Sequence, residues 1–256
     1  MKSKKILLLL IGVLFTGPLR ADISSTIVKV KSSVVIVGTY KNTNNPRFSL
    51  RGAGFVVGNG NLVITNAHVL QQPTEEDTDV ALVIQVRTGP NEWQMRPVTV
   101  LEVDKLHDLT LLHFEGSAVP ALSMRDSNSV QEGQAIAFMG FPIGGALGFS
   151  PVTHRGMVSS ITKVALPTAS AQQLNEKTIR SLRSGNSFDV FQLDGTAYPG
   201  NSGGPLFDPD SGEVLGILNM VFIKGTRESA LTNPSGISYA IPSRFIQQLL
   251  QRGNAN

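Results

Sequence analysis

The sequence of 256 residues contains no cysteine. Without thiols the chain can form no disulfide, offers no cysteine nucleophile and cannot hold zinc through cysteine. Charged residues make up only 16% of the chain against 41% hydrophobic residues, which excludes a disordered protein and indicates a globular one. Internal repeats and low-complexity segments are also missing. The length is sufficient for one large domain or two small ones.

Long apolar runs are scarce, and the one that stands out lies at the N-terminus. Three lysines in the first five residues precede an apolar stretch over residues 6–15, and a Gly17-Pro18 pair and Ala21 follow it. The stretch is well short of the roughly 20 apolar residues that span a bilayer. We therefore predict a secretory signal peptide over residues 1–21 and no stable membrane anchor after its cleavage, with an uncleaved anchor as the weaker alternative.

The basic character of the sequence belongs to this leader. The whole chain has a formal net charge of +3 and a pI of about 9.3. Four basic residues and no acidic residue lie in the leader, so its removal leaves a net charge of −1. No basic stripe remains in the rest of the chain, and we predict no nucleic-acid partner.

Short runs of β-branched residues, separated by glycine and proline, dominate the rest of the chain. The predicted strands are 33–40, 54–57, 61–65, 80–86, 97–103, 109–114, 135–140, 156–164, 190–193, 214–222 and 237–241. This spacing indicates an all-β barrel or sandwich and not alternating β/α units. Two helices are predicted: a polar one at 170–182, interpreted as a surface insertion, and a packed C-terminal one at 243–251 that begins with a serine cap.

The most unusual stretch is DGTAYPGNSGGPLFD, from Asp194 to Asp208. It places Ser202 among three glycines directly before an apolar run, although glycine weakens strands. A plain turn would explain one glycine pair but not the whole pattern. Glycines beside a serine would instead let the backbone N–H groups of Gly200 and Ser202 point at one substrate oxygen, with room above the hydroxyl.

A serine nucleophile needs a base and an acid that orients the base. Only four histidines exist. His68 follows a predicted strand, whereas His113 and His154 lie in or beside strands and are interpreted as packed side chains. Asp108 directly precedes strand 109–114, and a carboxylate drawn into the protein there would need an imidazole partner. His107 is a poor partner for Asp108 because neighbouring side chains of an extended chain face opposite ways.

Four segments together resemble the trypsin-like serine peptidases, most of all the protease domain of the HtrA/Deg branch. They are GAGFVVGNGNLVITNAHVL, HDLTLL, GNSGGPLFD and GISYAIPS, and the resemblance covers about residues 25–250. It implies two six-stranded antiparallel β-barrels with a C-terminal helix. The trypsin-like protease domain would occupy residues 22–256, with a first barrel at about 25–120 and a second at about 125–250.

The resemblance also implies the roles of the site residues. His68 would be the general base and then the general acid, Asp108 would orient it, and Ser202 would form the acyl-enzyme. The N–H groups of Gly200 and Ser202 would form the oxyanion hole. We therefore predict an exported serine endopeptidase of unfolded or exposed polypeptides, periplasmic or else secreted, that needs no metal and no cofactor. The alternative is a proteolytically silent peptide-binding or chaperone module on the same scaffold.

Specificity is inferred from the same resemblance. Thr196 would lie near the floor of the S1 pocket, and Leu218, Asn219 and Met220 would form one wall. Because position 196 carries no acid, cleavage after lysine or arginine is not expected. Small to medium apolar P1 residues are the predicted preference.

The sequence departs from the family pattern in several places. Asn201 stands where digestive relatives have the aspartate that pairs with a newly cut N-terminus, so we predict no activation cleavage beyond removal of the leader. Segment 140–151 resembles the mobile activation loop, and segment 166–187 is a longer insertion whose effect on the cleft stays open. DPDSGE at 208–213 is interpreted as a hairpin turn and not as a calcium loop. The PDZ domains usual in HtrA proteins are not expected, and the oligomeric state stays open.

Overall fold

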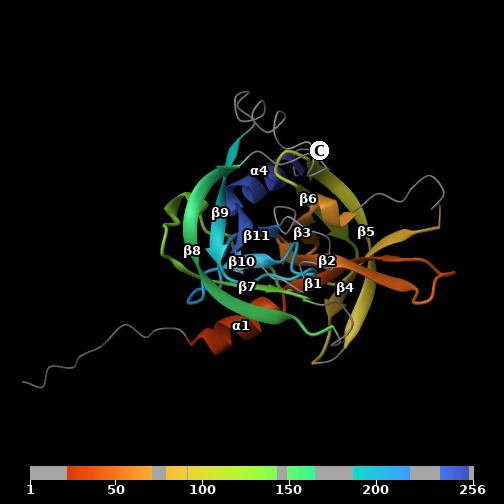
Figure 1. Cartoon of the computed structure of the whole chain (residues 1–256). Helices are drawn as coiled ribbons and strands as arrows, with labels where there is room; N and C mark the ends of the chain where they lie inside the picture. Colours follow the sequence, from red (N-terminus) through yellow and green to blue (C-terminus); the bar gives the residue numbers. More distant parts are fainter. Residues whose placement is uncertain are drawn as a thin grey trace, which may run out of the picture.

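The computed structural model describes residues 22–70, 79–90, 92–142, 149–164, 187–219 and 237–253. These residues form two closed six-stranded antiparallel barrels and a C-terminal helix, so the predicted fold class is confirmed (Figure 1). The proposed leader, the predicted helix at 170–182 and Met220 lie outside the described residues. The same holds for the middle of segment 140–151 and for nearly all of segment 166–187.

The first barrel consists of β1 to β6. Their bounds are Val34–Tyr40 (β1), Phe48–Val57 (β2), Leu62–Asn66 (β3), Ala81–Arg87 (β4), Trp93–Asp104 (β5) and Leu109–Phe114 (β6). The strand order is β1-β2-β3-β6-β5-β4, and β1 pairs with both β2 and β4, which closes the barrel. Its interior is filled mostly by β-branched and aliphatic side chains such as Val37, Val63 and Ile84.

The second barrel consists of β7 to β12. Their bounds are Ala135–Gly140 (β7), Val152–Val164 (β8), Phe188–Asp194 (β9), Pro205–Phe207 (β10), Val214–Asn219 (β11) and Ile237–Pro242 (β12). The strand order is β10-β11-β12-β9-β8-β7, and β10 pairs with β7 to close it. Aromatic side chains contribute more here than in the first barrel, with Phe138 and Phe191 in its core.

The two barrels share an apolar cluster that joins them. It includes Phe55 and Leu111 of the first barrel together with Met139, Phe207 and Ile217 of the second. In Figure 1 the first barrel, orange to yellow, lies beside the second, green to blue. Because the ends of strands from both barrels border this contact, polar side chains at those ends can meet there.

Strand existence was predicted better than strand bounds. β6 and β7 have the predicted bounds, whereas β2 begins at Phe48, six residues before the predicted start. The early half of β2 alternates between partly buried and exposed side chains and contains Arg51, so its composition does not indicate a buried strand. β10 was not predicted, because its three residues are too few for a periodic pattern.

Helix α4 (Ser243–Gly253) begins at the predicted serine and buries Phe245, Ile246 and Leu249. It follows β12 of the second barrel, yet it also packs against β5 and β6 of the first barrel (Figure 1). The Ser243 hydroxyl donates a hydrogen bond of 2.6 Å to the carbonyl of Arg125. α4 therefore links the end of the chain to both barrels.

Helix α1 (Ile23–Lys31) was not predicted from the sequence. Its composition, ISSTIVKVK, is rich in β-branched residues and serine, which lowers intrinsic helix propensity. The helix is held by the Asp22 side chain, which caps the Ser24 N–H at 3.1 Å, and by Thr26, whose hydroxyl donates to the carbonyl of Asp210 at 3.2 Å. Capping and tertiary packing thus override the local preference. No helix within the described residues is long and apolar enough to cross a membrane.

Segment 208–213 forms the turn between the antiparallel strands β10 and β11. Its two outer carboxylates bind the guanidinium of Arg125. The Arg125 Nη1 donates to Asp208 Oδ2 at 2.9 Å, and the Arg125 Nη2 donates to Glu213 Oε2 at 2.8 Å. This arginine occupies the position that a cation would need between the carboxylates, so the hairpin interpretation agrees with the geometry.

The Arg125 cluster predicts an acid-sensitive contribution to stability. Burial alone would raise the pKa of Asp208, but hydrogen bonds from backbone N–H groups and the charge of Arg125 outweigh burial and lower this pKa below its usual value. A hydrogen bond from Arg125 also lowers the pKa of Glu213. Carboxylates with depressed pKa values stabilise the fold above their unfolded pKa of about 4, and this stabilisation is lost as the pH falls. We expect Arg125→Met to lower the melting temperature at pH 7 and to flatten its decline between pH 5 and pH 2.

Circular dichroism melting curves across this pH range test the prediction. Arg96→Met is a matched control, because Arg96 donates to the neutral acceptors Gln94 Oε1 and Ser117 O. This control should leave the slope of melting temperature against pH unchanged. An unchanged slope in Arg125→Met would contradict the prediction.

Candidate active site

His68 and Asp108 are brought together by the pairing of β3 with β6. The register places Asn66, the last residue of β3, opposite Leu109, the first residue of β6. His68 lies two residues beyond β3, in the short 3₁₀ helix η1 (Ala67–Leu70), and Asp108 lies one residue before β6. Both side chains therefore emerge at the same barrel end, although 40 residues separate them in the sequence.

The contact between these two residues is close and twofold. The His68 ring Nδ1 lies 2.5 Å from Asp108 Oδ2, and the His68 backbone N–H donates to Asp108 Oδ1 at 2.8 Å. Because Nδ1 faces a carboxylate, it carries the proton, and Nε2 is left to accept one. Asp108 is buried and His68 is partly exposed, so the imidazole is available to a substrate.

Asn219 has a side-chain contact that the sequence did not predict. Its side-chain amide donates to Asp108 Oδ2 at 2.7 Å, and the residue is completely buried. The resemblance predicts Asn219 in the wall of the S1 pocket, and the structure adds that its side chain binds the carboxylate that holds His68. The signal in the sequence was a single polar residue at the end of the apolar strand VLGILN.

The segment before Ser202 forms a tight turn. The Asn201 N–H donates to the Tyr198 carbonyl at 2.9 Å, with Pro199 and Gly200 between them and a φ of +100° at Gly200. Proline followed by a residue of positive φ is typical of a type II turn. A Cβ at Gly200 would overlap the carbonyl oxygen of Phe141, so only glycine fits. Neither the Gly200 nor the Ser202 N–H donates to an acceptor within the described part of the chain.

Ser202 lies at the contact between the barrels. Its carbonyl accepts a hydrogen bond of 2.8 Å from the Ala53 N–H of β2, and the next residue, Gly203, donates to the Leu218 carbonyl of β11 at 3.0 Å. A Cβ built on Gly52 would lie 2.9 Å from the Ser202 carbonyl and 2.8 Å from the side chain of Val69, which follows His68. Ser202 is therefore held beside the helix that carries the histidine.

The hydroxyl of Ser202 makes no hydrogen bond to His68 in the described residues, which include both side chains. The structure thus joins His68, Asp108 and Asn219 by hydrogen bonds, and places the serine next to them without the last bond. Such bonds are often long in enzymes without substrate and shorten in the Michaelis complex.

Gly203 predicts a strong effect of one added methyl group. Its φ is +84°, and a Cβ would overlap the Ala53 carbonyl oxygen and lie 2.5 Å from Thr65 Oγ1. Gly133 has the same φ of +84° with nothing within 4 Å of a built Cβ. We expect Gly133→Ala to cost about 1–2 kcal/mol from the backbone conformation alone. Gly203→Ala should cost several times more, because it also separates the two barrels at the site.

Urea denaturation of the two alanine variants measures this difference. Equal losses of unfolding free energy in Gly203→Ala and Gly133→Ala would contradict the packing argument. Peptidase activity should be lost in Gly203→Ala only.

Asn201 is completely buried, and neither atom of its side-chain amide has a hydrogen-bond partner among the residues that the structure describes. It packs against Gly140, where a Cβ would lie 2.8 Å from the amide oxygen. An unpaired buried carboxylate would cost far more than an unpaired buried amide. The environment is therefore suited to the neutral residue that the sequence supplies.

The residues proposed for S1 lie after β9 and in β11. Thr196 is partly exposed in a segment held by Ser238, whose hydroxyl accepts from the Ala197 N–H at 3.0 Å and donates to the Gly195 carbonyl at 2.6 Å. Leu218 is fully buried in the core of the second barrel, and its backbone is bonded to Gly203 and Gly204 directly after Ser202. The contribution of Met220 lies outside the described residues.

Of the remaining histidines, His107 and His154 are packed against other side chains, whereas His113 is partly exposed. His154 stacks on Phe138 with ring centroids 4.9 Å apart, and burial lowers its pKa. His113 lies 3.7 Å from Glu115. His107 points to Asp104 and not to His68. No group of three or more histidine, aspartate or glutamate side chains suited to a metal ion occurs in the described ranges.

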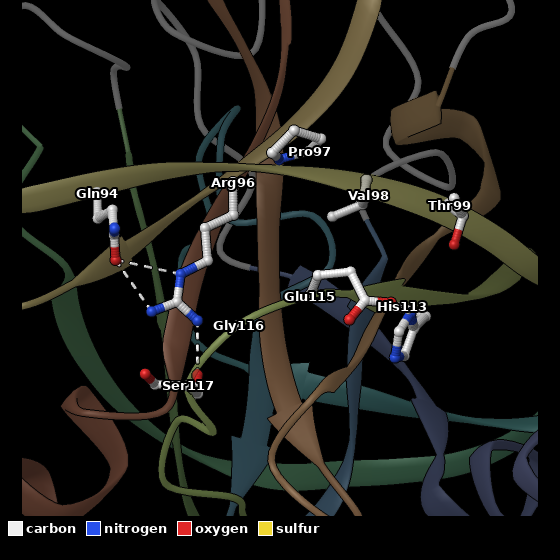
Figure 2. Close-up of a pocket in the computed structure, with 9 residues that line it drawn as sticks. All are labelled: Gln94, Arg96, Pro97, Val98, Thr99, His113, Glu115, Gly116 and Ser117. Atoms are coloured by element: carbon white, nitrogen blue, oxygen red, sulfur yellow. Dashed lines mark hydrogen bonds and ion pairs between the residues drawn. The ribbon is translucent and has the colours of Figure 1, made fainter.

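A surface pocket of about 430 Å³ lies at the other end of β6 from Asp108, around His113 and Ser117. Figure 2 shows that the Arg96 side chain in this pocket is directed at Gln94 and Ser117, with hydrogen bonds to both. The guanidinium is thus already bound by neutral acceptors of the protein. Since the pocket is separated from His68 by the length of a strand, it is not part of the candidate active site.

Comparisons with known proteins agree with the fold. Residues 52–217 match the family described as "Trypsin-like peptidase domain". A probable periplasmic serine endoprotease, DegP-like, from Marinomonas sp. is 32% identical over 201 residues, covering 78% of this chain and 35% of the relative. Serine protease HTRA4 of Mus musculus is 29% identical over 234 residues, covering 90% of this chain and 40% of the relative.

Solved structures show the same fold. The HtrA-type protease AlgW with a decapeptide superposes with a TM-score of 0.66 at 19% identity, covering 92% of this chain and 68% of that one. This chain spans well under half the length of the curated relatives that it matches. The chain contains a trypsin-like peptidase domain and belongs to the trypsin-like peptidase family, in which its named relatives are HtrA-type serine proteases.

Proposed function

We propose that this chain is a serine endopeptidase that cleaves unfolded or exposed polypeptides through an acyl-enzyme on Ser202. The observation that carries the proposal is the 2.5 Å contact between His68 Nδ1 and Asp108 Oδ2, with Ser202 held beside the same helix. The solved structures of AlgW that are similar to this chain contain a decapeptide or a tripeptide, which supports a polypeptide as the substrate class.

The first half-reaction follows from these positions. The Ser202 hydroxyl attacks the scissile carbonyl carbon while His68 Nε2 takes its proton. The carbonyl oxygen becomes an oxyanion, and the N–H groups of Gly200 and Ser202 are available to bind it because neither has another acceptor among the described residues. His68 then gives the proton to the leaving amine, the C–N bond breaks, and an ester on Ser202 remains.

The second half-reaction releases the product. Water attacks the ester carbon, and His68 accepts a proton from the water and returns it to the Ser202 oxygen. Asp108 stabilises the imidazolium that forms twice per cycle. The Asn219 amide supports this role, because it donates to the same carboxylate oxygen as the His68 ring.

Specificity and location are part of the same proposal. With threonine and no acid at position 196, we propose that small to medium apolar P1 residues are preferred. We also propose that residues 1–21 are an export signal and that the mature protein acts in the periplasm, or else is secreted. The periplasmic name of the Marinomonas relative supports this location.

Casein digestion, combined with labelling by a serine-directed phosphonate, tests the proposal. We expect wild-type protein to digest casein and to carry one phosphonate, which peptide mass mapping should assign to Ser202. Labelling without digestion would indicate a narrow substrate range. If the wild type shows neither, the proposal fails in favour of a proteolytically silent peptide-binding module. For export, N-terminal sequencing of the extracytoplasmic protein should begin at Asp22.

A further inference from the structure

Asp108 has a backbone conformation that needs support from its surroundings. Its φ is +53°, the only positive value at a residue other than glycine within the described ranges. Such a conformation costs about 1–2 kcal/mol, and it persists when neighbouring contacts over-determine it. On one side, the Asp108 carbonyl accepts from the Ala67 N–H at 3.0 Å and from the Asn66 amide at 3.1 Å.

The support on the other side comes from His107. Its backbone N–H donates to Asp104 Oδ1 at 3.0 Å, and its ring Nδ1 lies 2.9 Å from Asp104 Oδ2. Asp104 is the last residue of β5 and pairs with Leu109, so these bonds close the turn that carries Asp108. Two consecutive residues thus take part in two different Asp–His pairs. Asp108 is paired with His68, and His107 is paired with Asp104.

The ring of His107 contacts α4, which follows the second barrel, and β9 of that barrel. It stacks on Phe245 of α4 with centroids 3.9 Å apart and an interplanar angle of 21°, and meets Phe188 of β9 edge-on at 4.6 Å. Only 9% of the residue is exposed. The turn that carries Asp108 belongs to the first barrel, yet its histidine is held by side chains of α4 and β9.

An ion pair ties the same turn to the end of α4. Arg252 Nη2 donates to Asp104 Oδ2 at 2.7 Å, and its Nε lies 3.6 Å from Glu102 Oε1. Burial alone would raise the pKa of Asp104, but hydrogen bonds from His107 and Arg252 lower it well below its usual range. Asp104 therefore stays charged at neutral pH and can accept from both partners at once.

We propose that His107 is a positioning residue. Its ring is stacked on Phe245 and bonded to Asp104, and it thereby holds the β5–β6 turn in the position in which Asp108 meets His68. Docking of the C-terminal helix is in this way coupled to the alignment of Asp108 with His68. The inference rests on the proposed function for its kinetic consequence. Its structural part, the geometry of Asp108 and His68, can be measured without turnover.

Two substitutions separate the two contacts of the ring. His107→Phe keeps an aromatic ring between Phe245 and Phe188 but loses the bond to Asp104, and His107→Asn keeps a donor near Asp104 but loses the stacking. Because displacement of a catalytic group by about 1 Å can cost on the order of 100-fold in rate, we expect each variant to lower kcat by about 10- to 100-fold, with KM nearly unchanged. His113→Phe, at the far end of β6, is the matched control.

The decisive measurement is the low-field proton resonance of the His68 ring bonded to Asp108. We expect it to be shifted or broadened in both His107 variants and unchanged in His113→Phe, with the full chain used throughout.

Arg252→Met keeps the test informative if the His107 variants fold poorly. Arg252 is 45% exposed, so its loss should not unfold the protein, and we expect a smaller change of resonance and kcat in the same direction. If the His107 and Arg252 variants lower the melting temperature but leave the resonance and kcat as in the wild type, His107 is only a packing residue and the inference is overturned. An inactive wild type that keeps a resonance sensitive to His107 would refute the proposed function alone.

Discussion

Ser202→Ala should lower kcat for peptide hydrolysis by on the order of 10⁶-fold, the largest effect expected of any single substitution in this chain. The nucleophilic oxygen is removed, whereas the turn that positions it is made by the backbone of residues 198–201 and stays intact. The residue is only 6% exposed, and alanine differs from serine by one oxygen, so the fold should tolerate the change.

Active-site titration and steady-state kinetics on a peptide substrate measure this effect. Ser129→Ala is the control, because its exposed hydroxyl only donates to the carbonyl of Asp126 in its own turn. It should keep full activity, and both variants should melt near the wild-type temperature. A Ser202→Ala protein that retains more than a few per cent of the activity would show that another group is the nucleophile.

Asp108→Asn should lower kcat by on the order of 10⁴-fold, the loss that this change causes in a Ser-His-Asp protease. The carboxylate now accepts from the His68 N–H, the His68 ring and the Asn219 amide. An amide has one oxygen and one NH₂ group, so it cannot accept from all three. If the NH₂ group of the new asparagine faces the His68 ring, it donates to Nδ1 and favours the tautomer of His68 with the proton on Nε2. In that tautomer Nε2 cannot accept the proton of Ser202, so His68 cannot act as the base.

The rate of phosphonate labelling distinguishes this explanation from unfolding. Phosphonate labelling of Ser202 should be much slower in Asp108→Asn but still specific, because the serine and the two backbone donors remain. Asp126→Asn is the matched carboxylate-to-amide control, since Asp126 caps η2 (Ser127–Ser129) through one oxygen that asparagine also has. If Asp108→Asn labelled as fast as this control, the role proposed for Asp108 would be wrong.

Much of the fold could be predicted because the strands have a strong local pattern. Runs such as LTLLHF and AIAFMG are apolar, rich in β-formers and bounded by turn residues, and they form β6 and β7 with the predicted bounds. The prediction failed where local composition and tertiary packing disagree. Helix α1 contradicts its β-branched composition, and β10 is a strand because β7 and β11 pair with its three residues.

The candidate site divides in the same way. His68 and Asp108 could be proposed from the sequence because each adjoins the end of a recognisable strand, and strand ends hold polar side chains at the rim of a barrel. Asn219 could not be assigned to Asp108, because 111 residues separate them and nothing local distinguishes a buried amide from a wall residue. The contact of His107 with Phe245 had no local signal either, since it joins a turn of one barrel to a helix that follows the other.

The sequence by itself determined the chemistry that this protein has available: no thiol, one serine among glycines, four histidines and a barrel pattern of strands. Only the tertiary structure decided which of these groups meet. Hydrogen-bonded strand registers and apolar packing between the barrels place residues dozens of positions apart within 3 Å of each other, as for His68 and Asp108. Local composition carries no record of such distances, because they depend on the whole set of strands closing at once.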